Sequence, residues 1–162
     1  MNRFVAVSLL TLAAVTAAPA GAQAPVTANP NHEELLASSD PKLAANKRLV
    51  YDFWREVFEA GHVELAPKYM TETYIQHNPL VASGREPFVN FLSRIVEPKP
   101  IQPKVTAPLV AILAEGDLVM MVFVRELKRP QDETKTYTTT WFDMWRIEDG
   151  KMAEHWDAAT LQ

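Results

Sequence analysis

The chain has 162 residues, no Cys, four His and a formal net charge of -4 at pH 7. This length suits one domain with a core of its own. The absence of Cys excludes disulfides, a thiolate nucleophile and Cys-ligated zinc. A mildly acidic balance without a Lys/Arg cluster gives no electrostatic footprint for nucleic acid.

Residues 1–22 have the pattern of a secretory signal peptide. Arg3 precedes the apolar run 4–15, and small residues follow as far as Ala22, an order typical of a cleavable signal. The run is too short to span a bilayer comfortably. We therefore predict cleavage before Gln23, export to the periplasm or the exterior, and no stable membrane span afterwards. An uncleaved anchor is the alternative.

The segment 23–40 is polar and is expected to be a flexible lead-in with little core material. The predicted folded domain is 41–162, and it begins with a long helix over 42–60 that Gly61 ends. The apolar face of this helix is rich in aromatic residues, which is typical of an ordinary core. Tyr51 and Trp54 on this helix could also line a binding cavity.

Two shorter helices are predicted over 63–70 and 85–95, with an extended stretch between them. That stretch ends at Asn78, because the residue before a proline avoids the helical region. His77 therefore lies where a strand stops. It either holds the turn or has a functional role.

The remainder of the chain predicts a sheet. The proline-rich stretch 97–104 must be irregular, and the alternating pattern beyond it predicts four strands, at 104–115, 118–128, 136–147 and 152–158. The second strand is apolar on both faces, which indicates either a homodimer formed through the outer sheet face or a strand buried in its own core. Helices followed by such a meander predict an α+β domain, in which a curved mixed or antiparallel sheet wraps the helices around a conical pocket.

The last strand carries a pair of titratable residues on one face, His155 and Asp157. If the Asp-Gly turn before it sets the register, Met144 lies opposite His155 and Phe142 lies opposite Asp157. Apolar neighbours raise the pKa of a carboxyl and an imidazolium lowers it, so a carboxylate between these effects can act as a general base. The alternative is a strand-end carboxylate that only binds a His or a backbone amide.

Several motifs occur in an order that resembles a known family. They are Tyr74-Ile-Gln-His-Asn-Pro79, Gly84-Arg85 before a Phe-rich helix, Ala114-Glu-Gly-Asp-Leu118, Phe142-Asp-Met-Trp-Arg-Ile-Glu-Asp-Gly-Lys151 and Glu154-His-Trp-Asp157. Over about residues 43–160 the chain resembles the SnoaL-like polyketide cyclases of the nuclear transport factor 2-like superfamily. This resemblance implies a cone-shaped α+β barrel with a deep pocket.

The resemblance also implies a chemistry. In such cyclases an Asp acts as general base in an intramolecular aldol condensation, aided by a His, without metal or cofactor. The matching positions are Asp157 as the base and His155 beside it, with His77 and Asn78 as donors to a carbonyl or enolate oxygen. The expected substrate wall comprises Asn78, Tyr51, Trp54, Phe142 and Met144. The predicted activity is that of a cofactor-independent cyclase, isomerase or dehydratase acting on a small apolar carbonyl compound.

Two other functions stay open at this point. An exported, non-catalytic module that binds a small hydrophobic ligand or a partner needs only the apolar pocket. In addition, His77, His155 and Asp157 are the ligand types of a two-His, one-carboxylate iron site if His77 faces the same pocket.

Overall fold

The computed structural model describes residues 23–161, so the predicted signal peptide lies outside the described part of the chain. The helical elements are α1 (His32–Leu36), α2 (Pro41–Phe53), the π-helix η1 (Trp54–Glu59), the 3-10 turn η2 (Val63–Leu65), α3 (Ala66–Tyr69) and α4 (Arg85–Leu92). The strands are β1 (Met70–Gln76), β2 (Leu109–Glu115), β3 (Leu118–Arg129), β4 (Asp132–Glu148) and β5 (Lys151–Asp157). None of the helices in the described range is both long and apolar enough to cross a bilayer.

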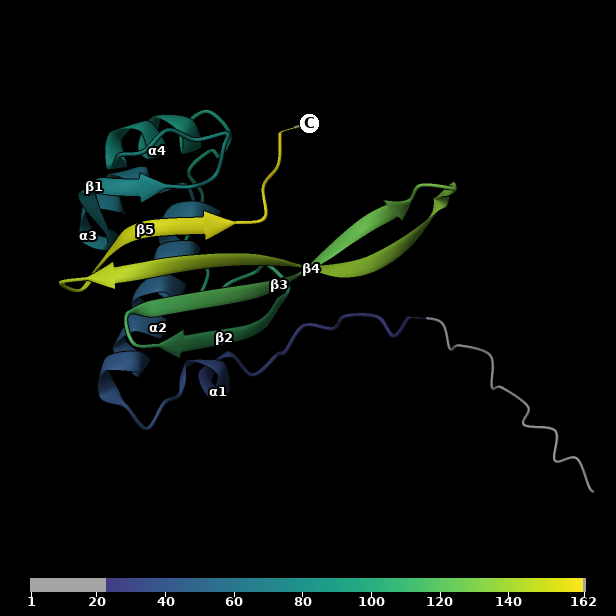
Figure 1. Cartoon of the computed structure of the whole chain (residues 1–162), viewed down its shortest axis with the longest axis horizontal. Coiled ribbons are helices and arrows are strands. Elements are labelled where there is room, and N and C mark those ends of the chain that lie inside the picture. Colours follow the sequence, from purple (N-terminus) through teal and green to yellow (C-terminus); the bar gives the residue numbers. More distant parts are fainter. Residues whose placement is uncertain (1–22, 162) are drawn as a thin grey trace, which may run out of the picture.

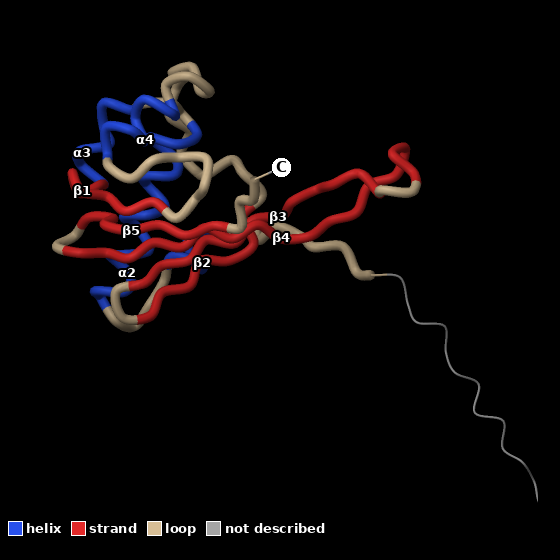
Figure 2. The backbone as a smooth tube through the Cα atoms, turned by 45° about the horizontal axis from the view of Figure 1, so that its top comes forward, coloured by secondary structure: helices blue, strands red, loops and turns tan. Residues whose placement is uncertain are grey.

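The strands form one sheet in the order β1-β5-β4-β3-β2 (Figure 1). Strand β1 is parallel to β5 and the other pairs are antiparallel, so the sheet is mixed. Figure 2 shows the far ends of β3 and β4 leaving the rest of the sheet as a two-stranded ribbon. The arrangement confirms the predicted α+β class.

Helix α2 and its continuation η1 supply the helical side of the core. Asp40 caps the helix, because its carboxylate accepts hydrogen bonds from the backbone N–H groups of Lys42, at 2.8 Å, and Leu43. Val50 and Val57 are fully buried. Gly61 ends the helix with a φ of 74°, which a residue without a Cβ adopts readily.

The segment 23–40 contributes more to the domain than expected. Its helix α1 buries Leu36 and His32, and the N–H of Asn29 donates to the carbonyl of Leu109 on the edge strand β2, at 2.8 Å. The prediction of a lead-in with little core material was wrong, because a short amphipathic turn is hard to distinguish from a polar linker in sequence. The packed domain begins before residue 41.

The register of the last hairpin corrects a prediction. Ile147 lies opposite Met152, as the two-residue turn requires, but Ala153 is then an extra residue and Arg146 pairs with Glu154. This is a β-bulge, which advances the register of one strand by one residue. No residue in this hairpin predicts the bulge, because Ala fits a regular strand as well as a bulge.

The bulge changes the neighbours of the titratable pair. Trp145 lies opposite His155, and Asp143 lies opposite Asp157. The predicted pairing of His155 with Met144 and of Asp157 with Phe142 was therefore wrong. A second carboxylate faces Asp157 in place of an apolar side chain.

Candidate functional site

A cavity of about 310 Å³ lies between the helices and the inner face of the sheet. Its described lining consists of Phe53, Trp54, Phe58, Tyr74, Gln76, Asn78, Val81, Phe88, Phe91, Ile95, Trp141, Asp143, Trp145, His155 and Asp157. The polar members come from β1 and the residues after it, from β4 and from β5. The helices contribute only apolar and aromatic side chains, so the cavity has a polar wall and a hydrophobic wall.

Asp143 and His155 form a buried pair on the polar wall. Each residue is less than a tenth exposed, and His155 Nε2 lies 3.0 Å from Asp143 Oδ1. Burial raises the pKa of Asp143, while the hydrogen bond and charge of His155 lower it and the charge of Asp157 raises it further. The carboxyl in this site that is held above its ordinary pKa is thus Asp143.

Gln76 determines which nitrogen of His155 carries a proton. Its Oε1 accepts the backbone N–H of Asn78 at 3.0 Å, so the atom that faces His155 Nδ1 at 2.6 Å is an acceptor. His155 must therefore carry a proton on Nδ1. One further proton lies between His155 Nε2 and Asp143, giving either an imidazolium and a carboxylate or two neutral groups.

Asp157 is the accessible carboxylate of the cavity. Its Oδ2 accepts a hydrogen bond from Asn78 Nδ2 at 2.6 Å, and its Oδ1 accepts the backbone N–H of Ala159 at 2.9 Å. Its side chain is only partly buried. These two donors fix the orientation of the carboxylate and leave a lone pair on each oxygen for a bound molecule.

Four of the predicted site residues lie in the cavity lining: Asp157, His155, Asn78 and Trp54. His77 does not. Its Nε2 lies 2.8 Å from Glu154 Oε1, its ring stacks on Trp156, and its side chain is 45% exposed. Side chains alternate along an extended chain, so Gln76 and Asn78 face the cavity and His77 faces away.

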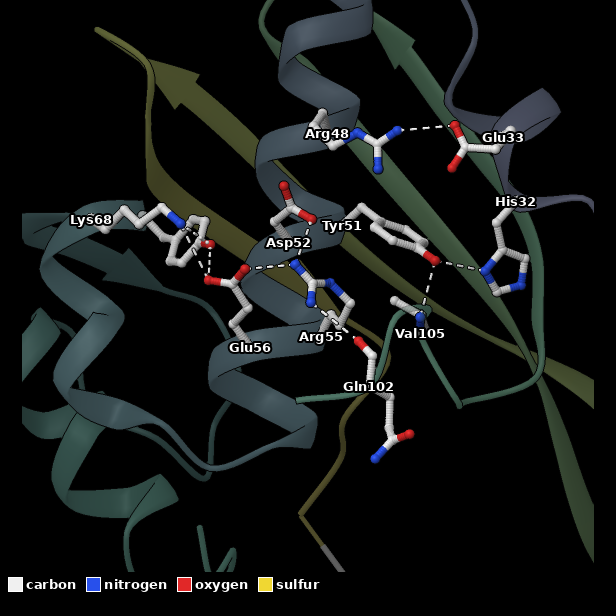
Figure 3. Close-up of polar contacts among 11 residues, drawn as sticks. His32, Glu33, Arg48, Tyr51, Asp52, Arg55, Glu56, Lys68, Gln102 and Val105 are labelled. Atoms are coloured by element: carbon white, nitrogen blue, oxygen red, sulfur yellow. Dashed lines mark hydrogen bonds and ion pairs between the residues drawn. The ribbon is translucent and has the colours of Figure 1, made fainter. Parts of the chain in front are cut away.

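Tyr51 is also absent from the cavity lining. Figure 3 shows its hydroxyl directed toward His32 and Val105. Its hydroxyl accepts the backbone N–H of Val105 at 3.0 Å and donates to His32 Nδ1, 2.8 Å away. It is a buried link between α2, α1 and the stretch before β2. The prediction that Tyr51 lines the substrate site was wrong, because its side chain is directed at α1 and the stretch before β2, where its hydroxyl is bound by His32 and Val105.

Phe142 and Met144 face away from the cavity as well. They alternate along β4 with Asp143 and Trp145, which line it, so they belong to the outer face of the sheet. Phe142 is 42% exposed. Their predicted role as substrate contacts was wrong because the bulge at Ala153 places Asp143 and Trp145, and not Phe142 and Met144, opposite Asp157 and His155.

Two site residues were missed in the sequence. Gln76 is two residues after Tyr74 in an extended stretch, so the two side chains share a face. Asp143 shares a face with Trp145 and Ile147 for the same reason. Both signals were available, but the register across the hairpin was needed to place Asp143 beside Asp157.

Asp143, His155 and Asp157 each offer one metal-ligand atom, and these atoms lie within 4.8 Å of one another. Both nitrogens of His155 are, however, hydrogen-bonded to Gln76 and Asp143, so a metal would have to displace one of these partners. The iron site suggested by the sequence needed His77, whose outward position is incompatible with it.

Comparisons with known proteins agree with the geometry. A sequence profile of the SnoaL-like domain matches residues 50–155. A search of curated proteins finds no match.

Solved structures resemble this one at low identity. A putative polyketide cyclase from Acidithiobacillus ferrooxidans is 17% identical, with a TM-score of 0.51 over 75% of this chain and 89% of that chain. A putative SnoaL-like polyketide cyclase from Jannaschia sp. is 14% identical, with a TM-score of 0.50 over 75% and 91%. An epoxide hydrolase from M. tuberculosis, of the LEH-like type, is 14% identical, with a TM-score of 0.50 over 72% and 84%. At such identities the likeness shows the shared cone-like α+β fold alone.

Proposed function

Because this chain belongs to the SnoaL-like domain family, we propose that it is a cofactor-independent acid–base enzyme acting on a small, mostly apolar carbonyl compound. The reaction is of the aldol or cyclase, isomerase or dehydratase type. The observation that carries this proposal is an accessible carboxylate, Asp157, next to a buried Asp143–His155 pair at one wall of an aromatic cavity.

The proposed first step is proton abstraction from the carbon next to the carbonyl. The C–H bond breaks, an O–H bond forms on Asp157, and the electron pair moves onto the carbonyl oxygen as an enolate. Asn78 donates one amide hydrogen to Asp157 and can offer the other to the enolate oxygen. The enolate then attacks a second carbonyl carbon, whose oxygen takes the proton from Asp157 as the new C–C bond forms, or the enolate takes that proton back from Asp157 at another carbon.

Asp143 and His155 act next to this step without forming a hydrogen bond to the substrate. Asp143 Oδ2 is buried and has no hydrogen-bond partner among residues 23–161, and both nitrogens of His155 are occupied. With this shared proton the pair has no net charge beside Asp157, whether it is an imidazolium and a carboxylate or two neutral groups. This keeps the polar wall from carrying two adjacent negative charges, which would oppose formation of an enolate.

Asp157→Asn tests the proposal. The amide keeps the shape of the carboxylate but cannot take up a proton, so we expect deuterium uptake next to the carbonyl of methyl ketones in D2O to fall at least about 100-fold. Proton NMR measures this exchange. Asp117→Asn, in the exposed turn between β2 and β3, is the matched control and should leave the rate unchanged. A fully active Asp157→Asn enzyme would rule out Asp157 as the base.

The second candidate function is a non-catalytic module that binds a small hydrophobic ligand. The largely aromatic lining favours it, because an apolar cavity suffices for binding. If methyl ketones bind but wild-type protein exchanges none of their hydrogens above the rate in buffer, the binding module replaces the enzyme.

A further inference from the structure

The size of the cavity limits what it can hold. Its volume is about 310 Å³, whereas an apolar protein cavity of roughly 150 Å³ accommodates one benzene. A ligand of about two fused rings therefore fits. A single ring leaves half of the volume unfilled, and three rings exceed it.

The charges of the cavity limit it further. The described lining contains two carboxylates and neither Lys nor Arg. His155 is held by Gln76 and Asp143 and has no nitrogen free for a ligand. An anionic ligand would place its charge near Asp143 and Asp157 in a medium of low dielectric without a compensating cation, which is costly.

The shape of the lining favours flat molecules. Eight of its fifteen described residues are Phe, Tyr or Trp, and aromatic faces pack best against other aromatic faces or edges. A ligand whose carbonyl lies at Asp157 and Asn78 projects its remaining atoms among these rings.

Phe58 is one of three aromatic rings in the lining that are only partly buried, together with Phe91 and Trp141. It belongs to the π-helix η1, a form that often occurs at functional sites, and its ring stacks on Trp54 with the centroids 4.4 Å apart. Phe53 and Trp145, by contrast, are 2% exposed and belong to the core. Trimming Phe58 therefore enlarges the cavity next to Trp54 without removing a fully buried core side chain.

We propose that the cavity binds neutral, planar ligands of about the volume of two fused aromatic rings, and that Phe58 sets this size limit. This rests on the proposed function, since it names the substrate class of the same site.

Calorimetric titration with four probes tests the proposal without requiring turnover: acetophenone, acetylnaphthalene, acetylanthracene and naphthoate. We expect acetylnaphthalene to bind about tenfold more tightly than acetophenone, because it buries one more ring. We also expect it to bind at least about tenfold more tightly than the anion naphthoate. Equal affinity for naphthoate, or no binding by any probe, overturns the proposed ligand class.

Phe58→Ala tests the size limit. Relative to acetylnaphthalene, acetylanthracene should gain at least about fivefold in affinity, because the removed ring makes room for the third ring of the ligand. Phe142→Ala, on the outer sheet face, is the control and should leave the order of the probes unchanged. If Phe58→Ala does not fold, Phe58→Leu gives a smaller shift of the same sign. An unaltered order in a folded Phe58 variant refutes the size limit.

The two proposals fail in different ways. Tight binding of acetylnaphthalene without hydrogen exchange contradicts the acid–base function and leaves the ligand class standing. Hydrogen exchange in small ketones without tighter binding of acetylnaphthalene contradicts the ligand class and leaves the acid–base function standing.

Discussion

Gln76 shows how one neutral side chain determines the protons of a site. It accepts from the backbone of Asn78 and from His155, and this double role leaves His155 a donor on Nδ1. Within this pair, the proton between His155 Nε2 and Asp143 Oδ1 is then the one that can transfer from one residue to the other. An Asn or Glu at position 76 would change either the reach or the charge of this contact.

The raised pKa of Asp143 makes stability depend on pH. A carboxyl whose folded-state pKa lies above its unfolded value stabilises the fold fully below the unfolded pKa, near 3.8, and that stabilisation is lost as the pH rises through the folded value. Asp143→Asn removes this titration. We expect the free energy of unfolding of wild type minus that of Asp143→Asn to increase as the pH falls from about 7.5 to about 4.5.

Urea unfolding at several pH values measures this difference. The other titrating groups are shared by both proteins and cancel to first order. His155 and Asp157 lie close to Asp143, so the Asp143→Asn change also alters their electrostatic surroundings. The same unfolding series on Asp157→Asn measures how much of the pH dependence comes from the interaction between the two carboxylates. A difference that does not change with pH, or that falls as the pH falls, contradicts the raised pKa.

Two irregular elements build the site. The bulge at Ala153 in β5 brings Asp143 opposite Asp157, and the π-helix η1 continues α2 and carries Trp54 and Phe58 into the cavity lining. Both insert an irregularity into a regular element next to the cavity, where such features are common.

Helix α1 is joined to the domain through Tyr51. Tyr51→Phe leaves His32 Nδ1 and the N–H of Val105 without their partner, and both groups are buried. We expect the free energy of unfolding to fall by about 1–3 kcal/mol. Ligand affinity should not change, since Tyr51 lies outside the cavity lining.

Denaturant unfolding and calorimetric titration measure these two effects. Tyr137→Phe, on the β3–β4 ribbon, is the control and should leave both unchanged. Loss of ligand affinity at unchanged stability would return Tyr51 to the binding site.

The outer face of the sheet bears on the oligomeric state of the protein. It carries an apolar strip of Ala111, Leu113, Met120, Phe142 and Met144, which alternate with buried residues of β2, β3 and β4. Leu113 is 58% exposed. Exposed apolar patches of this kind often mark an interface.

We propose that this face forms a homodimer. Phe142→Glu should convert the dimer to a monomer, because burying an unpaired carboxylate in an apolar interface costs more than the lost contacts alone. Light scattering after gel filtration measures the mass. Leu80→Glu, at an exposed apolar residue outside the strip, should leave the dimer intact. A monomeric wild type sinks this proposal.

Export is the second proposal for the whole molecule. When the full chain is expressed in a Gram-negative bacterium, we expect the protein in the periplasmic fraction to begin at Gln23. Intact mass spectrometry checks this. An uncleaved chain retained in the membrane fraction would support the anchor instead.

The sequence by itself determined the order of helices and strands from residue 41 onward, the α+β class, the resemblance to the SnoaL-like family and the shared face of His155 and Asp157. These follow from local periodicity, caps and turns, which act over a few residues. Only the tertiary structure decided that Asp143 faces Asp157, that Gln76 holds His155, and that His77, Tyr51, Phe142 and Met144 lie outside the cavity. Those positions depend on pairing between distant strands and on one extra residue, Ala153, whose effect on register appears only when two strands meet.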